Sequence, residues 1–171
     1  VKTNEELQMA RLAYKLAMPT KKIDMKIPVA VSARHAHLNL ETFKELFGED
    51  AELTKYKDIS QPGQYASNER INLLGPKGRI DKVRILGPLR SKNQIEISRT
   101  DEYKLGVDAP VRRSGHVEGS APIIIEGPLG QKQLKEGLIC AWRHIHMTES
   151  EATKFDLKTG DEVEVLVDGG Q

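Results

Sequence analysis

Four of the five histidines in this 171-residue sequence fall into two His-x-His pairs, His35/His37 and His144/His146. Residues i and i+2 of a β-strand point to the same face, so each pair can direct two imidazoles at one point. Imidazole nitrogen is a standard zinc ligand. Each pair could instead be two inert, hydrogen-bonded surface histidines, but two pairs in equivalent contexts favour a metal site.

A metal site needs a third ligand, and the acidic residues are its source. Within the segment Gln94–Ser98, alternation places Glu96 on the strand face opposite Ile95 and Ile97. An acid in a short strand commonly faces solvent, so Glu96 is a candidate and no more on this ground. The fifth histidine, His116, has glycines nearby that favour a surface loop.

Arg90 precedes the Glu96 segment, and a guanidinium beside a metal ion would suit a phosphate through bidentate hydrogen bonds and charge. Cys140 is the only cysteine, which excludes an intramolecular disulfide, fits a reducing cytosol and leaves a small core residue as its simplest role. The sequence contains no P-loop, no G-x-G-x-x-G and no G-x-S-x-G motif, so nucleotide-triphosphate and serine-hydrolase chemistry lose their usual support.

The elements that must hold these residues are predicted mainly as short strands separated by glycine and proline. The predicted strands are Ile27–Ala33, Ile80–Leu86, Gln94–Ser98, Pro122–Ile125, Gly137–Trp142 and Glu162–Val167. Turns are expected at the three Gly-Pro steps, Gly75-Pro76, Gly87-Pro88 and Gly127-Pro128. Many short strands at this spacing favour a barrel or a sandwich.

Both histidine pairs lie in similar segments. Arg34–Asn39 is echoed 109 residues later by Arg143–Thr148, and each reads R-H-x-H, then an apolar residue, then a helix-capping residue. The first segment predicts a helix that ends at Gly48, and the second predicts a capping box with Glu151. This repetition indicates an internal duplication, with two similar units that each present His-x-His at the end of a strand.

Residues 1–20 are predicted to form an amphipathic helix and a linker, with a capping box at Thr3 and a stop at Pro19. Such an arm is either a docking segment or a targeting peptide. Elsewhere, 26 basic and 25 acidic residues give a formal net charge of +1, so nothing attracts the chain globally to nucleic acid or membrane. No apolar run approaches a membrane span of about 18 residues, and we expect a cytoplasmic protein without a membrane partner.

Four segments together resemble a known family. Ile27–Leu38, Ile97–Gly106, Ala109–Gly115 and Trp142–Met147 are similar to the PduL-type phosphate acyltransferases. These are the phosphate propanoyltransferases of bacterial microcompartments and their free relatives. The resemblance extends over residues 24–171 without large gaps.

The resemblance implies a mainly β fold with two small β-barrel domains capped by short helices. We expect the first barrel to be discontinuous, from residues 21–33 plus 142–171, and the second to comprise residues 34–141. It also implies a two-zinc site between the barrels, near a homodimer interface. The helix within residues 1–20 would then be a possible contact to microcompartment shell or core proteins.

By motif, the resemblance assigns His35, His37 and Glu96 to a first zinc ion, whose open position takes the sulfur of coenzyme A. His144 and His146 correspond to ligands of a second zinc ion. The family has another histidine for this ion, in an H-I-D-T-D-E-like motif, and residues 1–171 contain no such motif.

Four further residues match positions that contact substrates in the family. Arg90 corresponds to the phosphate-contacting arginine, and Ser114 to a nearby serine. Tyr103 lies where an aromatic ring stacks on the adenine of coenzyme A, and Ser32 is a second expected contact to that molecule.

The implied activity is a zinc-dependent phosphate acyltransferase, used in propanediol degradation, that converts propanoyl-CoA or acetyl-CoA and phosphate reversibly into acyl phosphate and coenzyme A. Because phosphate is itself the nucleophile, no acyl-enzyme is required. Two alternatives use the same ligands: a metal-dependent acyl-CoA hydrolase and a non-catalytic zinc-binding barrel protein. Only three obvious ligands surround the first pair, which favours an open catalytic position over a closed structural site.

Overall fold

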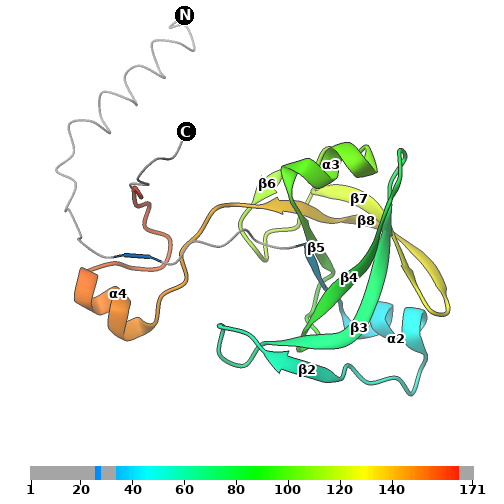
Figure 1. Cartoon of the computed structure of the whole chain (residues 1–171), viewed down its shortest axis with the longest axis horizontal. Helices are drawn as coiled ribbons and strands as arrows, with labels where there is room; N and C mark the ends of the chain where they lie inside the picture. Colours follow the sequence, from blue (N-terminus) through cyan, green and yellow to red (C-terminus); the bar gives the residue numbers. More distant parts are fainter. Residues whose placement is uncertain (1–25, 28–33, 166–171) are drawn as a thin grey trace, which may run out of the picture. The chain divides into compact units, whose positions relative to one another are not determined.

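Six strands close into a mixed β-barrel in the computed structural model, which describes residues 26–27 and 34–165 (Figure 1). Around the barrel, β3 pairs with β4, followed by β1, β5, β8 and β7, and β7 pairs back with β3. β2 pairs with β3 and β6 pairs with β8 outside this circuit. The described strands are β1 His35–His37, β2 Lys55–Asp58, β3 Tyr65–Leu74, β4 Arg79–Gly87, β5 Gln94–Ile97, β6 Val111–Arg112, β7 Ala121–Gly127 and β8 Gly130–Ala141.

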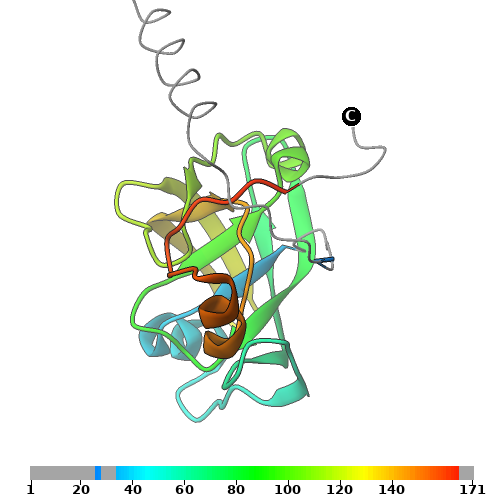
Figure 2. The same cartoon turned by 90° about the vertical axis from the view of Figure 1, so that its left-hand side faces the viewer.

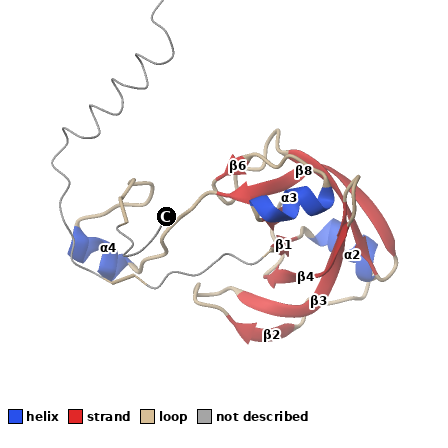
Figure 3. Ribbon diagram, turned by 45° about the horizontal axis from the view of Figure 1, so that its top comes forward, coloured by secondary structure: helices blue, strands red, loops and turns tan. Residues whose placement is uncertain are grey.

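Parallel and antiparallel pairs alternate around the short strand β1. β1 runs parallel to β4 and antiparallel to β5, and β5 in turn runs parallel to β8. Figure 3 shows the strands in red around a common interior, with α2 and α3 in blue beside them. The fold is therefore mainly β, as predicted, and the described residues contain one barrel.

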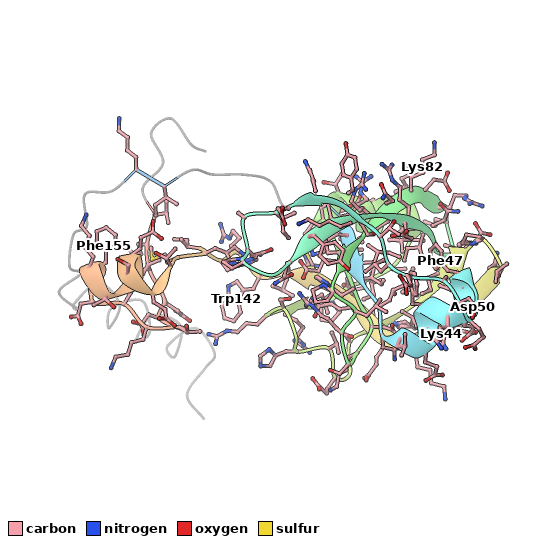
Figure 4. The ribbon with its side chains drawn as sticks, turned by 90° about the horizontal axis from the view of Figure 1, so that it is seen from below. Lys44, Phe47, Asp50, Lys82, Trp142 and Phe155 are labelled. Carbon is pink, nitrogen blue, oxygen red and sulfur yellow. The ribbon has the colours of Figure 1, made fainter. Side chains whose placement is uncertain are left out.

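The barrel interior is apolar and receives side chains from all six strands. Its strand residues are Ala36, Ile71, Leu73, Ile80, Val83, Ile85, Ile95, Ile97, Ile123, Ile125, Leu134, Leu138 and Cys140. In β4 the period of two breaks between Ile80 and Val83, where Lys82 has a φ of 59° and the register with β3 shifts. The Lys82 backbone N–H donates to Asn72 Oδ1 at 3.0 Å, which satisfies the bulged residue (Lys82 is labelled in Figure 4).

Helix α2, Leu40–Phe47, directly follows the first histidine pair and agrees with the prediction. The Asn39 side chain caps its first turn by accepting from the Thr42 backbone N–H, and the helix ends at Gly48. Phe43 and Leu46 are buried in the core. Figures 1 and 2 both show α2 near one end of the barrel and α3 near the other.

Helix α3, Arg99–Leu105, was not predicted. It begins immediately after β5, where Ser98 and Asp101 form a capping box. It ends at Gly106 in the left-handed conformation, with a φ of 72°. The sequence signal for this helix is the S-x-x-D spacing of Ser98 and Asp101. The prediction missed it because Ser98 was included in the preceding strand.

The predicted strands agree with the structure in the barrel and differ outside it. β4, β5 and β7 cover three of the predicted segments, and β8 begins at Gly130, seven residues earlier than expected. Within Ile27–Ala33, only Ile27 is described. Residues 162–165, the described part of the predicted strand Glu162–Val167, are exposed and are not part of a described strand.

The chain comprises two units, residues 30–146, which contain the barrel, and residues 1–29 with 147–171. In the second unit, α4, Glu149–Phe155, starts with the predicted capping box of Thr148 and Glu151. The predicted helix within residues 1–20 lies outside the described residues, and a first barrel from residues 21–33 and 142–171 remains a prediction. Among the described helices, none is long and apolar enough to cross a membrane.

Candidate active site

Strand pairing brings Glu96 to the first histidine pair. In the antiparallel register of β1 and β5, His35 lies opposite Glu96 and His37 lies opposite Gln94. Partner residues of antiparallel strands project to the same face, whereas Ala36 and its partner Ile95 face the core. The predicted alternation around Glu96 is therefore the one that forms the site.

The geometry of these three side chains suits a metal ion. One ligand atom each from His35, His37 and Glu96 lies within 4.8 Å of the other two. His35 Nε2 and Glu96 Oε2 are 3.4 Å apart, close to the roughly 3.3 Å that separates two ligands of a tetrahedral zinc ion with bonds of about 2.0–2.1 Å. His37 is 2% exposed and Glu96 is 5% exposed, so little water competes for this position.

His37 is neutral and offers a lone pair. Burial lowers the pKa of His37 to about 3, and the charges of Arg90 and His35 act in the same direction. Its Nδ1 is buried and has no hydrogen-bond partner among the described residues. A buried polar atom without a partner is costly, and a metal ion would satisfy it.

Glu96 carries the negative charge that a metal ligand needs. Burial acts to raise its pKa, but hydrogen bonding with His35, the charges of His35 and His37, and a hydrogen bond with Ser114 outweigh this and hold the pKa at about 2. At neutral pH this site thus presents an ionised carboxylate beside a neutral imidazole, the protonation states in which both groups bind a metal ion.

Arg34, the residue before His35, anchors the strand that carries the pair. Its Nε and Nη2 lie 3.1 and 2.9 Å from the two carboxylate oxygens of Asp101, in a bidentate ion pair. Asp101 is buried and also closes the capping box on Ser98, two residues after Glu96. One acid thereby holds β1 and the end of β5 together beside the candidate ligands.

Arg90 and Ser114 lie close to the ligands. The Arg90 guanidinium is half-buried; burial lowers its pKa and the charge of Glu96 opposes this effect. Arg90 Nη2 donates to Gln64 Oε1 at 3.1 Å. Ser114 Oγ accepts a hydrogen bond of 2.8 Å from Gln94 Nε2, and Gln94 also donates to Glu96.

A small cavity lies beside this group. Its volume is about 90 Å³, and it is lined by Arg90, Ser91, Lys92, Gln94, Gly115 and Val117. Two of these residues, Arg90 and Lys92, are cationic. Lys92 forms an ion pair with Glu118 on the surface.

The second histidine pair lies in a different environment. β8 ends at Ala141, and His144 and His146 follow it in an exposed segment without regular structure. His144 Nε2 and His146 Nε2 are 3.0 Å apart, and His144 Nδ1 lies 2.6 Å from the Trp142 carbonyl oxygen. Within the described part of the chain, no third histidine, cysteine or acid completes a ligand group here.

Electrostatics relate this pair to the first site. Burial lowers the pKa of His146, the charge of His144 lowers it further, and the charge of Glu96 raises it. Gln61 Nε2 lies 2.8 Å from His146 Nε2. Gln61 belongs to the loop between β2 and β3 that also provides Gln64 to Arg90.

The remaining predicted residues lie apart from these groups. Tyr103 is 84% exposed on α3, and Ser32 lies outside the described residues. His116 is exposed in a loop, as expected. Cys140 is a core residue, as expected, and burial raises the pKa of its thiol.

Sequence reasoning missed three glutamines, Gln61, Gln64 and Gln94. Gln94 carried a usable signal, because it shares a strand face with Glu96 at a spacing of two. Gln61 and Gln64 lie in a loop whose sequence shows no motif, and only the fold brings them to the histidines and Arg90.

Comparison with known proteins shows the family of this chain. The family model described as phosphate propanoyltransferase matches residues 28–171. The phosphate propanoyltransferase from Thermotoga maritima is 50% identical over 144 residues, which is 84% of this chain and 69% of the relative. The one from Rhodobacter capsulatus is 50% identical over 143 residues, which is 84% of this chain and 66% of the relative. The one from Lachnoclostridium phytofermentans is 50% identical over 148 residues, or 86% of this chain and 69% of the relative.

The chain spans about two thirds of the length of these relatives. The match nevertheless includes both histidine pairs, Glu96, Arg90 and Ser114 within one continuous family segment. On the extent of the family match and the identity of these relatives, the chain belongs to the phosphate propanoyltransferase family, a family of acyltransferases.

Proposed function

We propose that this chain catalyses the reversible transfer of a short acyl group, propanoyl or acetyl, from coenzyme A to phosphate. The observation that carries the proposal is the buried group of His35, His37 and Glu96, with Arg90 next to it. A buried set of three ligands leaves a fourth coordination position for a reacting group. A zinc ion bound by them would supply Lewis acidity at the thioester and a position for the leaving sulfur.

Arg90 is the residue best suited to hold phosphate. Its planar guanidinium is fixed by Gln64 at one nitrogen, which leaves its other N–H groups for a bidentate contact to phosphate oxygens. The adjacent cavity of about 90 Å³ adds the cationic Lys92. Both features favour an anion beside the three ligands.

In the proposed reaction, a phosphate oxygen forms a bond to the thioester carbonyl carbon and the carbon–sulfur bond breaks. The products are acyl phosphate and the thiolate of coenzyme A. The role of Arg90 is to orient phosphate and to balance its charge as it approaches Glu96. Ser114 is proposed to donate its hydroxyl to phosphate in exchange for the hydrogen bond that this hydroxyl makes with Glu96, while Ser114 Oγ continues to accept from Gln94.

Neither candidate side-chain nucleophile suits an acyl-enzyme. Cys140 is buried among core residues, and burial raises its pKa, which disfavours the reactive thiolate. Ser114 bonds Gln94 and Glu96, and neither is the histidine base that commonly activates a serine nucleophile. Direct attack by phosphate is therefore the simpler route.

His144 and His146 are proposed as two ligands of a second zinc ion. The Trp142 carbonyl oxygen only accepts, so in neutral His144 it fixes the proton on Nδ1 and leaves a lone pair on Nε2. Nε2 of His146 lies 3.0 Å away, a separation that suits two ligands of one ion.

Several partner assignments are also part of the proposal. Tyr103 is exposed and would stack on the adenine of coenzyme A, with Ser32 as a further contact. A homodimer, a location inside a bacterial microcompartment and a targeting role for residues 1–20 stay predictions from the family resemblance.

Thiol release from acetyl-, propanoyl- and butyryl-CoA, measured with and without phosphate, tests the function. We expect release only with phosphate, together with an equal amount of acyl phosphate. Release at full rate without phosphate would identify a hydrolase, and no release in a zinc-loaded sample would leave a binding protein.

A further inference from the structure

Gln94 is a buried amide at the centre of the candidate site. It lies on β5, is 2% exposed, and pairs in register with His37. Its side chain makes three hydrogen bonds: Nε2 donates to Glu96 Oε1 at 2.7 Å and to Ser114 Oγ at 2.8 Å, and Oε1 accepts from the Gly115 backbone N–H at 2.6 Å. One side chain therefore connects a candidate metal ligand with the loop that carries Ser114.

The partners fix the orientation of this amide. An ionised carboxylate only accepts hydrogen bonds and a backbone N–H only donates. Gln94 must therefore present Nε2 to Glu96 and Oε1 to Gly115. In the flipped amide, Oε1 would face a Glu96 oxygen, so two acceptors would meet, and Nε2 would face the Gly115 N–H, so two donors would meet. Both N–H groups of Gln94 are used in this arrangement.

The amide also determines which oxygen of Glu96 is available to the histidines. Oε1 is engaged by Gln94, and Oε2 is the oxygen that lies 3.4 Å from His35 Nε2. Without the Gln94 contact, only His35, which lies beside Oε2, and Ser114 would restrain rotation of the Glu96 carboxylate. A supporting hydrogen bond of this kind orients a ligand and typically changes metal affinity about 10–100-fold.

The same side chain positions the loop after β6. Ser114 and Gly115 are exposed, and Gly115 has a φ of 90°, a conformation that favours glycine. The Gly115 N–H is held by Gln94, and the loop turns back where the His116 N–H donates to the Arg113 carbonyl at 3.1 Å. The position of Ser114 next to Glu96 thus depends on β5 through Gln94.

We infer that Gln94 is a positioning residue that sets two parts of the site with one amide: the carboxylate orientation of Glu96 for the metal ion, and the place of Ser114 for phosphate. The inference rests on the proposed function for its phosphate half, whereas its metal half concerns zinc affinity alone. Loss of the amide weakens zinc binding and phosphate use together, although Gln94 is neither one of the candidate metal ligands nor the residue proposed to hold phosphate.

The test is the zinc affinity of the purified chain, measured by competition with a chelator, in Gln94→Met and in matched controls. Methionine keeps the length and approximate volume of glutamine but removes all three hydrogen bonds. We expect zinc affinity to fall about 10–100-fold. The control Gln131→Met removes an amide-to-carboxylate bond of 2.8 Å to Glu126 on the exposed β7–β8 hairpin, and it should leave zinc affinity unchanged.

Ser114→Ala separates the two halves. It removes the Ser114 hydroxyl and the bond of that hydroxyl with Glu96, but it leaves the bond from Gln94 to Glu96, so zinc affinity should fall less than in Gln94→Met, near the low end of the roughly 10–100-fold range. Under the proposed function, phosphate KM should rise in both Ser114→Ala and Gln94→Met. If the chain has no transferase activity, the zinc measurements still decide the metal half.

Gln94→Asn provides a second variant if the methionine variant unfolds, since it keeps a polar amide and withdraws it by one methylene. Denaturant unfolding of the metal-free proteins identifies a general loss of stability. Zinc affinity that falls in Gln94→Asn without a matching fall in stability supports the role. Wild-type zinc affinity in a folded Gln94 variant would overturn it.

Discussion

The two histidine pairs have the same spacing and the same neighbouring sequence, but the barrel uses them differently. His35 and His37 lie within β1, between two paired strands, and His37 is buried. His144 and His146 lie beyond the end of β8, and both are exposed. The first pair faces a buried carboxylate, whereas the second pair contacts the Trp142 carbonyl, Gln61 and itself.

This difference shows that a His-x-His motif supplies two ligands and that the paired strand supplies the third. β5 runs beside β1 and places Glu96 opposite His35. Trp142, labelled in Figure 4, is the last residue here bonded to a described strand, through its backbone N–H to the Arg112 carbonyl of β6, and no described strand pairs with residues 143–146. In the part of the chain that the structure describes, the same motif therefore has a third candidate ligand at the first pair and none at the second.

The largest expected effect is the loss of zinc from the first pair in His37→Ala. Removing a ligand from a group of three should lower zinc affinity more than about 100-fold, beyond the roughly 10–100-fold attributed to supporting residues. Chelator competition and metal analysis check this, and turnover should be abolished. Zinc content and rate equal to those of the wild type would refute the assignment of His37.

The second largest expected effect is a loss of stability at acidic pH that arises from His37. The pKa of His37 falls from an ordinary 6.5 to about 3 on folding, so the unfolded chain binds its proton first and stability is lost as the pH decreases below about 6.5. Glu96, with a pKa of about 2, loses its contribution only at still lower pH, below its ordinary 4.5.

Between pH 7 and 5, His37 should reduce the free energy of unfolding of the metal-free protein by about 2 kcal/mol. Denaturant unfolding at both pH values checks this value. In His37→Gln, the decrease in the free energy of unfolding between pH 7 and 5 should be about 2 kcal/mol smaller than in the wild type. In His144→Gln, that decrease should equal the wild-type value. An equal decrease in wild type and His37→Gln would show that His37 titrates normally.

His144→Ala should have a smaller effect, and on a different quantity. We expect turnover to fall about tenfold, the result of losing roughly 1.4 kcal/mol of transition-state stabilisation. Zinc bound by the first pair should keep its affinity, because none of its three ligands is changed. A loss of tight zinc in this variant would mean that both pairs share one ion.

Arg90→Lys should have the smallest effect. Lysine keeps the charge but loses the planar fork, so phosphate KM should rise about fivefold to tenfold, near the roughly 1 kcal/mol of one ordinary hydrogen bond. Acyl-CoA KM and zinc affinity should change less. Equal increases in both KM values would make Arg90 a structural residue, held by Gln64 and the Leu38 carbonyl.

The sequence predicted those parts of the site that depend on local spacing. The cap at Asn39, the stop at Gly48 and the common face of His35 and His37 follow from positions a few residues apart. Glu96 was only a candidate from alternation, and the family resemblance made it a ligand. Its register opposite His35 is a property of the closed barrel, which no local pattern encodes.

Other elements could not be predicted because their sequences lack the expected period. β3 carries Asn68, Glu69 and Arg70 in its middle, and irregular register on both sides disrupts the alternation of its apolar residues. The exposure of His144 was equally hidden, because the end of β8 is set by pairing with β6 and not by a turn residue.

The short length of β1 has a consequence for synthesis of the chain. β1 contains three residues, and its partners are β4 and β5, which begin at Arg79 and Gln94. During translation the two histidines emerge well before Glu96, and β8, which completes the barrel, emerges later still. The complete ligand group therefore forms only after these distant pairings, which are the slow steps of β folding. Zinc retention by a nascent or truncated chain would thus report barrel closure itself.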